Sequence, residues 1–503
     1  MDDDGVTFPE IDGRRSTSAT GRAVAADAVR DVDPGLARAI MAEQDWRRGY
    51  LDHYRDLTFR AAARPGAALA ISAAGLDSVH ERFRFRRDGE DLPLRETVRA
   101  GLEEARRRPA LFTVTVAGSG PAVAPGLSVP YHGARLTGDA LRRRLDRWLA
   151  DGVAEPSFAA AIEAVQAEPE QLDLRGLTVV VLGAGAELGP VVSLLRWGAH
   201  VVAVDLPGYP TWRRLIDTAR TSPGRLSIPV RHWLPDGATD DEIATAAGVD
   251  VIAETPQLFG WLAELQGPFT LGNYVYADGA VHVRASVAID ALTAELTRLR
   301  PDLSLAFLAT PTDVFCVPSE AMEDSRRRYA QRSWARRLGG LGTAGRLFAP
   351  NYEGPITLSD GRPAGLNDSM VPQQGPNYAL AKRVQRWRAL HERAAGRLVS
   401  LNIAPATRTR SVLRNRLLAA GYSGAHQFGV EVFDPSTSNT LMAALLAHDL
   451  RDPLAAANPA VPQGHPLELF WSQAIHGGLW RTPFAPRSVL GAAVVLGMVQ
   501  RGA

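Results

Sequence analysis

The sequence predicts an α/β fold built on a doubly wound parallel sheet, with a mostly helical N-terminal region and a helical C-terminal extension. Two observations predict it. An apolar, β-branched run at 177–182 is followed by a glycine-rich turn, a short helical stretch and a second apolar run at 199–205. Such a βαβ unit is the building block of parallel sheets. Candidate strands and helices then alternate to about residue 403.

Strands buried on both faces of a sheet have nearly continuous apolar runs. Beyond the first two runs, we expect strands at 226–230, 249–253, 303–309 and 398–403. Apolar residues at three- or four-residue spacing predict helices at 285–299 and 378–394. We therefore assign three parts: a helical region at 1–172, a Rossmann domain at 173–415 and a helical extension at 416–503.

One stretch interrupts the alternation. Residues 312–374 are rich in Arg, Gly and Pro and show weak periodicity. An irregular span of this length is usually a lid, a binding loop or an inserted subdomain. We expect an insertion within the Rossmann domain.

Bulk composition excludes several classes of protein. The net charge of +1 gives no reason to expect nucleic acid as a partner. The single cysteine, Cys316, cannot form an intrachain disulfide or a thiolate metal cluster, and we predict no metal site. The acidic N-terminus lacks the apolar core of a secretory signal, and the longest apolar stretch, 489–499, is too short to span a bilayer. We expect a cytoplasmic protein without a membrane span, with 489–499 as a buried C-terminal helix.

The turn after the first strand has the composition of a phosphate-binding turn. Gly183 and Gly185 allow tight curvature and close approach of a pyrophosphate to the main chain, and Gly189 completes the glycine pattern. A helix starting near Leu188 would present free N–H groups to that anion. Asp205 ends the second strand, where a carboxylate accepts hydrogen bonds from adenosine ribose and disfavours the extra phosphate of NADP. The pattern predicts NAD binding, with NADP less favoured.

Two points qualify this interpretation. A βα turn of the same composition can be purely structural, without a ligand. Glu187 lies within the turn, and its carboxylate disfavours an anion unless it points away or pairs with an arginine.

The chain contains 55 arginines and one lysine, Lys382, which lies four residues after Tyr378. Residues i and i+4 share a helix face, so the phenol and the ammonium can point at one substrate. A phenol has a pKa of about 10, and a fixed cation nearby lowers it towards neutrality. Arginine's planar fork does not replace a compact ammonium in this role. The pair predicts a general acid/base, Tyr378, assisted by Lys382; a pair on the helix surface without function is the alternative.

These residues give segment 173–415 a resemblance to divergent short-chain dehydrogenases/reductases. The resemblance implies that Thr310, at the end of the fifth strand, binds the substrate oxygen. It implies that His282 takes the place of the family's helix-borne asparagine in the proton relay. It also implies that the segment 402–409, ending at Thr409, contacts the nicotinamide carboxamide.

The sequence departs from the family pattern at several positions. Glu187 stands where the family turn has a glycine, and 254–256 reads Glu-Thr-Pro where the family has Asn-Ala-Gly after the fourth strand. The interval from Thr310 to Tyr378 is far longer than in the family, as the insertion at 312–374 requires.

The residues and the resemblance together predict an NAD(P)-dependent oxidoreductase acting on a carbonyl or alcohol of a small-molecule substrate. An epimerase- or dehydratase-type reaction with tightly held NAD on the same scaffold is one alternative. A non-catalytic dinucleotide-binding protein is the other. The sequence leaves the substrate and the oligomeric state open, with a homo-oligomer as one possibility.

Overall fold

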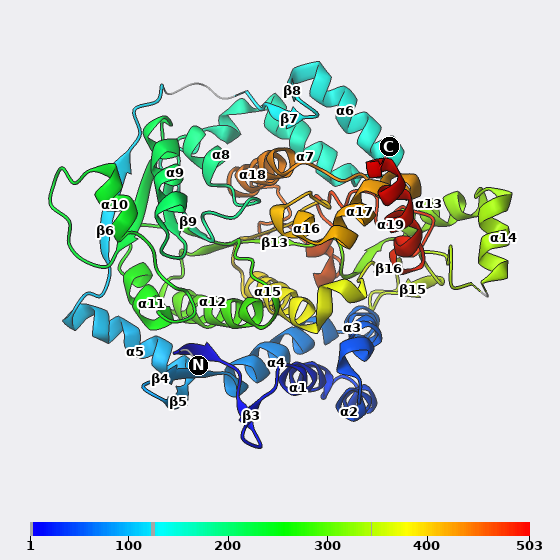
Figure 1. The fold of residues 1–503 in the computed structure, drawn as a ribbon, viewed down its shortest axis with the longest axis horizontal. Helices are drawn as coiled ribbons and strands as arrows, with labels where there is room; N and C mark the ends of the chain where they lie inside the picture. Colours follow the sequence, from blue (N-terminus) through cyan, green and yellow to red (C-terminus); the bar gives the residue numbers. More distant parts are fainter. Residues whose placement is uncertain (1–3, 122–125, 344, 503) are drawn as a thin grey trace.

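A seven-stranded, mostly parallel sheet forms the centre of the molecule in the computed structural model, which describes residues 4–121, 126–343 and 345–502 (Figure 1). The strand order is β17-β13-β12-β9-β10-β11-β6, and every neighbouring pair is parallel except β11 and β6. The strands are β6 (Phe112–Ala117), β9 (Thr178–Leu182), β10 (His200–Val204), β11 (Arg225–Val230), β12 (Thr270–Asn273), β13 (Ser304–Ala309) and β17 (Val399–Ile403). The chain is thus α/β, compatible with a Rossmann-like fold.

Both faces of this sheet are buried, as the apolar runs predict. In β9 and β10, alternate side chains belong to two different hydrophobic clusters, because successive side chains of a strand point to opposite faces. Val180 and Val202 pack into one cluster, and Val179 and Val201 into the other. The expected strands at 177–182, 199–205, 226–230, 303–309 and 398–403 are confirmed within a residue at either end.

Helices cover the two faces (Figure 1). The cluster containing Val180 includes side chains of α1 (Thr17–Val29), α2 (Pro34–Ala42), α3 (Trp46–Ala63), α4 (Ala67–Arg82), α5 (Leu94–Arg107), α11 (Thr255–Ala263), α12 (Gly279–Leu299) and α15 (Gly375–Ala394). The cluster containing Val179 includes side chains of α6 (Gly138–Asp151), α7 (Pro156–Ala167), α8 (Val191–Arg196), α9 (Tyr209–Arg220), α10 (Asp240–Ala246) and α18 (Pro435–Arg451). The mostly helical N-terminal region therefore contributes to both cores.

The fourth parallel strand differs from the expectation. The predicted strand at 249–253 is wrong: these residues form turns, and the carbonyl of Ile252 accepts a hydrogen bond from Val6 near the N-terminus. The strand that pairs with β9 is β12, which ends at Asn273. Consequently the Glu-Thr-Pro sequence at 254–256 does not follow a strand; it starts α11, with Glu254 as the N-cap.

The edge strand β6 comes from the N-terminal region. It pairs antiparallel with β11 over six residues, from Phe112 opposite Val230 to Ala117 opposite Arg225. The sheet therefore includes a strand from before residue 173, where the sequence suggested that the sheet-forming segment begins.

The insertion at 312–374 contains regular structure. Its strands β14 (Val314–Pro318), β15 (Pro355–Thr357) and β16 (Pro363–Asp368) form a separate antiparallel sheet in the order β14-β16-β15. Between β14 and β15 lie two helices, α13 (Ser319–Ala330) and α14 (Trp334–Gly342).

The C-terminal part is helical in α16 (Arg410–Arg414), α17 (Arg416–Gly424), α18 and α19 (Pro486–Gly502). The expectation of a buried helix at 489–499 is wrong in part. Val489 and Ala493 are buried, whereas Val495 is 61% and Val499 is 65% exposed. None of the helices in the described ranges has the length and apolarity needed to cross a bilayer.

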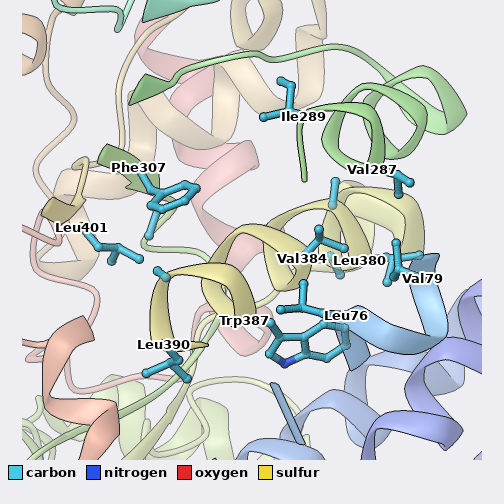
Figure 2. Packing of buried hydrophobic residues seen from close by; sticks show 14 of the residues in the cluster. Leu76, Val79, Val287, Ile289, Phe307, Leu380, Val384, Trp387, Leu390 and Leu401 are labelled. Carbon is cyan, nitrogen blue, oxygen red and sulfur yellow. The ribbon is translucent and has the colours of Figure 1, made fainter. Parts of the chain in front are cut away.

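The helix that carries the Tyr/Lys pair is locked on several sides. In Figure 2, apolar side chains of α15 pack between those of α4, α12, β13 and β17. Trp387 of α15 lies against Gly75 of α4, where an added Cβ would come within 2.5 Å of the indole ring. Leu380 and Val384 are also buried. This packing fixes the rotation of α15 and so the direction of its polar face.

Candidate active site

The carboxyl ends of the parallel strands bring the predicted site residues to one edge of the sheet. Gly183 directly follows β9, Asp205 follows β10 and Thr310 follows β13. The N-terminal part of α15, with Tyr378, reaches the same edge, because Gln374 donates hydrogen bonds to the Thr312 carbonyl at 3.0 Å and to its hydroxyl at 2.7 Å.

The turn after β9 requires glycine at its first position. Gly183 has φ +83°, and a Cβ there would lie 2.9 Å from the backbone nitrogen of Val275. The N–H groups of Gly183 and Ala184 both donate to the carbonyl of Val204, which holds the turn against β10. The glycine therefore allows three main-chain segments to meet at this point.

The helix after the turn begins later than expected. Residues 184–190 form turns, and α8 starts at Val191 rather than near Leu188. Pro190 is the N-cap residue of α8. Within the turn, the Gly189 N–H donates a hydrogen bond to the Ala186 carbonyl at 3.0 Å. A Cβ on Gly189 would lie 3.2 Å from that same oxygen.

Asp205 closes the turn from the end of β10. Its carboxylate accepts hydrogen bonds from the backbone N–H of Gly185 at 2.6 Å and of Leu206 at 2.8 Å. Burial raises the pKa of Asp205 above its ordinary value, although both hydrogen bonds and nearby Arg214 act in the opposite direction. A Cβ on Gly185 would come within 2.7 Å of Thr211 and 3.0 Å of Asp205.

Glu187 pairs with an arginine, one of the two ways in which the turn could tolerate its charge. Its carboxylate accepts from the Arg410 backbone N–H at 2.8 Å and from the Arg410 Nε at 2.7 Å. Arg410 opens α16, and Thr409 is the N-cap of that helix. The ion pair thus brings Thr409 and the segment after β17 next to the glycine turn.

Tyr378, Thr310 and Lys382 line one narrow pocket. Its other lining residues come from α3, the loop after β13, the segment that leads into α15 and α15 itself: Tyr50, Thr312, Asp313, Met370, Gln374 and Ala379. The Thr310 hydroxyl lies 2.9 Å from that of Thr312 and close enough to the Tyr378 phenol to lower its pKa. The predicted oxygen-binding residue and the predicted acid/base therefore meet.

Burial raises the pKa of Tyr378, and the interaction with Thr310 only partly opposes this effect. The direction is opposite to the one expected from an adjacent ammonium. Among the described residues, the hydrogen bonds of the Lys382 ammonium go to the Leu308 carbonyl at 3.2 Å and the Gln385 side chain at 3.1 Å, not to the phenol. Burial lowers the pKa of Lys382 to about 8.

His282 lies beside this pair. Its ring centroid is 5.5 Å from that of Tyr378 and 5.3 Å from that of Tyr276. Nδ1 accepts a hydrogen bond from the backbone N–H of Ala277 at 2.9 Å, so the ring proton is on Nε2. This Nε2–H is buried and has no hydrogen-bond partner among the residues that the structure describes. Burial and the charge of Lys382 lower the pKa of His282 to about 3, which keeps the ring neutral.

Sequence reasoning missed two features of the site. The first is Asn273, which ends β12 and so occupies the sheet edge that the family resemblance assigned to residues 254–256. Its Oδ1 accepts a hydrogen bond from the Val275 N–H at 3.3 Å. The sequence signal for this strand is weak, because β12 has only four residues and one of them is a glycine. The second feature is Asp313, which is buried against two arginines of α15.

The Asp313 carboxylate accepts from Arg383 Nη2 at 2.6 Å and from Arg386 Nη1 at 2.9 Å. The Arg386 guanidinium lies over the rings of Phe315 and Phe470, 4.3 and 4.4 Å from their centroids, and burial lowers its pKa to about 10. This network anchors the pocket wall to α15. Within the described ranges, no group of three or more His, Cys, Asp or Glu side chains is arranged to hold a metal ion.

Comparison with known proteins adds no relative to this geometry: no family model matches the chain, and no curated protein matches it. The candidate site therefore stands on its residues and their arrangement alone.

Proposed function

We propose that the chain is an NAD-dependent oxidoreductase acting on a carbonyl or alcohol group of a small molecule. The observation that carries the proposal is the presence of the glycine turn with Asp205 and the Tyr378 pocket at the same edge of a parallel sheet. Numbered along the chain, the six parallel strands have the spatial order 3-2-1-4-5-6, the order of doubly wound dinucleotide-binding sheets.

The residues at the turn fit such a cofactor. Arg410 neutralises Glu187, the one charge in the turn that would repel a pyrophosphate. Asp205 offers carboxylate oxygens to ribose hydroxyls, which favours NAD over NADP. When bound, NAD supplies hydride exchange at its nicotinamide ring.

Tyr378 exchanges the proton with the substrate oxygen, and Thr310 donates a hydrogen bond to that oxygen. The raised pKa keeps the phenol protonated, which suits proton donation during carbonyl reduction. Lys382, on the same face of α15 as Tyr378, would hold the ribose when the cofactor is bound. His282, whose ring lies 5.5 Å from that of Tyr378, would hold through its Nε2–H a water on the path by which the phenol regains its proton from solvent.

Binding and turnover test the proposal separately. Calorimetry should show binding of NAD(H), and nicotinamide absorbance should change with one or more members of a panel of aldehydes, ketones and secondary alcohols. Tyr378→Phe should reduce turnover by about 100-fold or more with an unchanged cofactor Kd. Tyr422→Phe, which removes a neighbouring phenol outside the proposed chemistry, is the matched control and should stay within about threefold of wild type.

The outcomes discriminate between the alternatives. Absence of NAD(H) and NADP(H) binding rejects the proposal. Binding without turnover on any substrate favours a non-catalytic dinucleotide-binding protein. NAD retained through purification, with turnover but no net absorbance change, favours an epimerase- or dehydratase-type reaction.

A further inference from the structure

Helix α14 exposes its apolar side chains. Trp334, Leu338 and Leu341 are 75%, 57% and 79% exposed, and their spacing of four and three residues places them on one face of the helix. No residue of α14 is buried. A helix on the surface of a globular protein normally turns such a face towards the core.

Helices α17 and α19 expose apolar side chains at the same end of the molecule as α14, and α16 lies beside α17 (Figure 1). Helices α17 and α19 cross closely, because a Cβ on Gly497 would lie 1.9 Å from the Ala420 carbonyl oxygen. Larger side chains of these helices and of α16 point outward: Leu413, Leu417, Val495, Leu496, Met498 and Val499 are 41–65% exposed.

Aromatic packing joins α14 to this helix pair. Phe348, which follows α14, contacts Phe428 and Phe484 with ring centroids 6.5 and 5.4 Å apart, and Phe428 and Phe484 pack in one cluster with Val489 and Ala493 of α19. We call the exposed apolar side chains of α14, α16, α17 and α19 named above, together with Arg336 and Arg337, the α14–α19 surface.

The segments that form this surface are basic. Between Asp324 and Glu353 the chain has seven arginines and no acidic residue, residues 410–424 contain three arginines and no acidic residue, and no acidic residue follows Glu468. Of these arginines, Arg327 and Arg328 pair with Asp324 and Arg410 pairs with Glu187, so the excess positive charge comes from the others. Arg336 and Arg337 donate to the backbone carbonyls of Gln427 and Ala330, which carry no net charge. The positive charge of the surface is therefore not neutralised by these contacts.

We infer that the α14–α19 surface docks on the surface of an anionic lipid bilayer, with the apolar side chains of α14 entering the headgroup region. A helix with Trp and Leu on one face and arginines beside it has the composition of an interfacial helix. The basic residues add attraction to anionic lipid near the surface. The inference is independent of the proposed oxidoreductase function.

Other occupants fit less well. In a symmetric dimer formed through this surface, two copies of the same basic patch would meet, which would concentrate positive charge at the interface. Nucleic acid would match the charge but would leave the Trp334, Leu338 and Leu341 side chains without an apolar environment. Bilayer binding satisfies both the charge and the apolar side chains.

Co-sedimentation of the full chain with vesicles tests the inference. The chain should sediment with vesicles of phosphatidylcholine plus phosphatidylglycerol and only weakly with phosphatidylcholine alone, and salt should weaken binding to the anionic vesicles. Trp334→Ser combined with Leu338→Ser and Leu341→Ser should lower the partition coefficient about tenfold or more. Arg336→Glu with Arg337→Glu should lower it on anionic vesicles, whereas Trp233→Ser, an equally exposed tryptophan outside the surface, should leave it unchanged.

All substituted side chains are exposed or half-buried, so each variant should keep its fold. Circular dichroism melting verifies this. Failure of the wild-type chain to sediment with either vesicle overturns the inference. An equal loss of binding in Trp233→Ser also overturns it, because the contact would not be specific to this surface. A concentration-dependent dimer that the α14 triple variant converts to monomer, without vesicle binding, assigns the surface to a second copy instead.

Discussion

Glu187 of the glycine turn and Arg410 of α16 form a two-point contact, in which the carboxylate accepts hydrogen bonds from the main-chain N–H and from the Nε–H of the arginine. The residues lie 223 positions apart in sequence. The pair ties the turn after β9 to the segment after β17 and masks a negative charge beside the proposed pyrophosphate position.

Removing Arg410 should expose that charge. Arg410→Ala is expected to raise the Kd for NAD by about tenfold, because the freed carboxylate repels the anion. Calorimetry at low and high salt measures the effect, which should shrink as salt screens the repulsion. Glu187→Gln in the same chain should restore binding, and Arg414→Ala, on the same helix, should have no effect. Equal loss in the double variant would contradict the electrostatic explanation.

Asp205 should set the choice between the two dinucleotides. Asp205→Asn keeps an oxygen that can accept from the Gly185 N–H but removes the charge that disfavours the 2′-phosphate of NADP. Arg214 lies near enough to lower the pKa of Asp205 and would then attract that phosphate. The ratio of NADP to NAD affinity is expected to rise about tenfold, measured by parallel titrations. An unchanged ratio would place the ribose elsewhere.

The buried charge of Lys382 should lower the free energy of unfolding at neutral pH. Burial lowers its pKa to about 8, so between about pH 8 and its ordinary value near 10.5 the unfolded chain holds more protons than the folded chain. The wild-type free energy of unfolding should therefore rise with pH across that window. Lys382→Met should be more stable than wild type at pH 7, on the order of 1–3 kcal/mol, with the gap closing by about pH 10.

Urea denaturation at several pH values measures this difference, and Lys382→Arg, which keeps a charge throughout, should show no such gain. A methionine variant less stable than wild type at pH 7 would mean that the ammonium makes a net stabilising contact. Under the proposed function, the same methionine variant should lose turnover.

Gly183 should tolerate no side chain. Gly183→Ala must place a Cβ 2.9 Å from the Val275 nitrogen on a residue with φ +83°, and it is expected to reduce the free energy of unfolding by about 2 kcal/mol. Gly208→Ala is the matched control, since its backbone is extended, with φ 168°, and apart from its chain neighbours no heavy atom of the described residues lies within 4 Å of the added Cβ. Chemical denaturation should show the control within about 0.5 kcal/mol of wild type.

The local sequence predicts much of this sheet, because five of its strands are dense runs of apolar and β-branched residues. The exceptions have physical causes. β12 is four residues long and contains Gly272, whereas the apolar run at 249–253 is buried as a turn through contact with Val6, far away in sequence. The edge strand β6 alternates exposed residues with half-buried or buried ones, and only its partner β11 identifies it as part of the sheet.

The same contrast holds at the candidate site. The spacing of Tyr378 and Lys382 on one helix could be read from the sequence, and the structure brings Thr310 to them as expected. The orientation of the Lys382 ammonium towards Leu308 could not be predicted from the sequence, because it depends on the packing that sets the rotation of α15. Two ion pairs likewise depend on the tertiary structure: Glu187 with Arg410, and Asp313 with Arg383.

The antiparallel strand β6 also affects how the chain can be made. During synthesis it leaves the ribosome more than 100 residues before its partner β11, so it stays unpaired until that partner has been translated. Until then its alternating Phe-Thr-Val-Thr-Val sequence is an open edge that other chains could join. Expression of a fragment starting at residue 173 would leave β11 in the same position permanently, with an exposed row of hydrogen-bonding groups, and such a fragment should aggregate where the full chain does not.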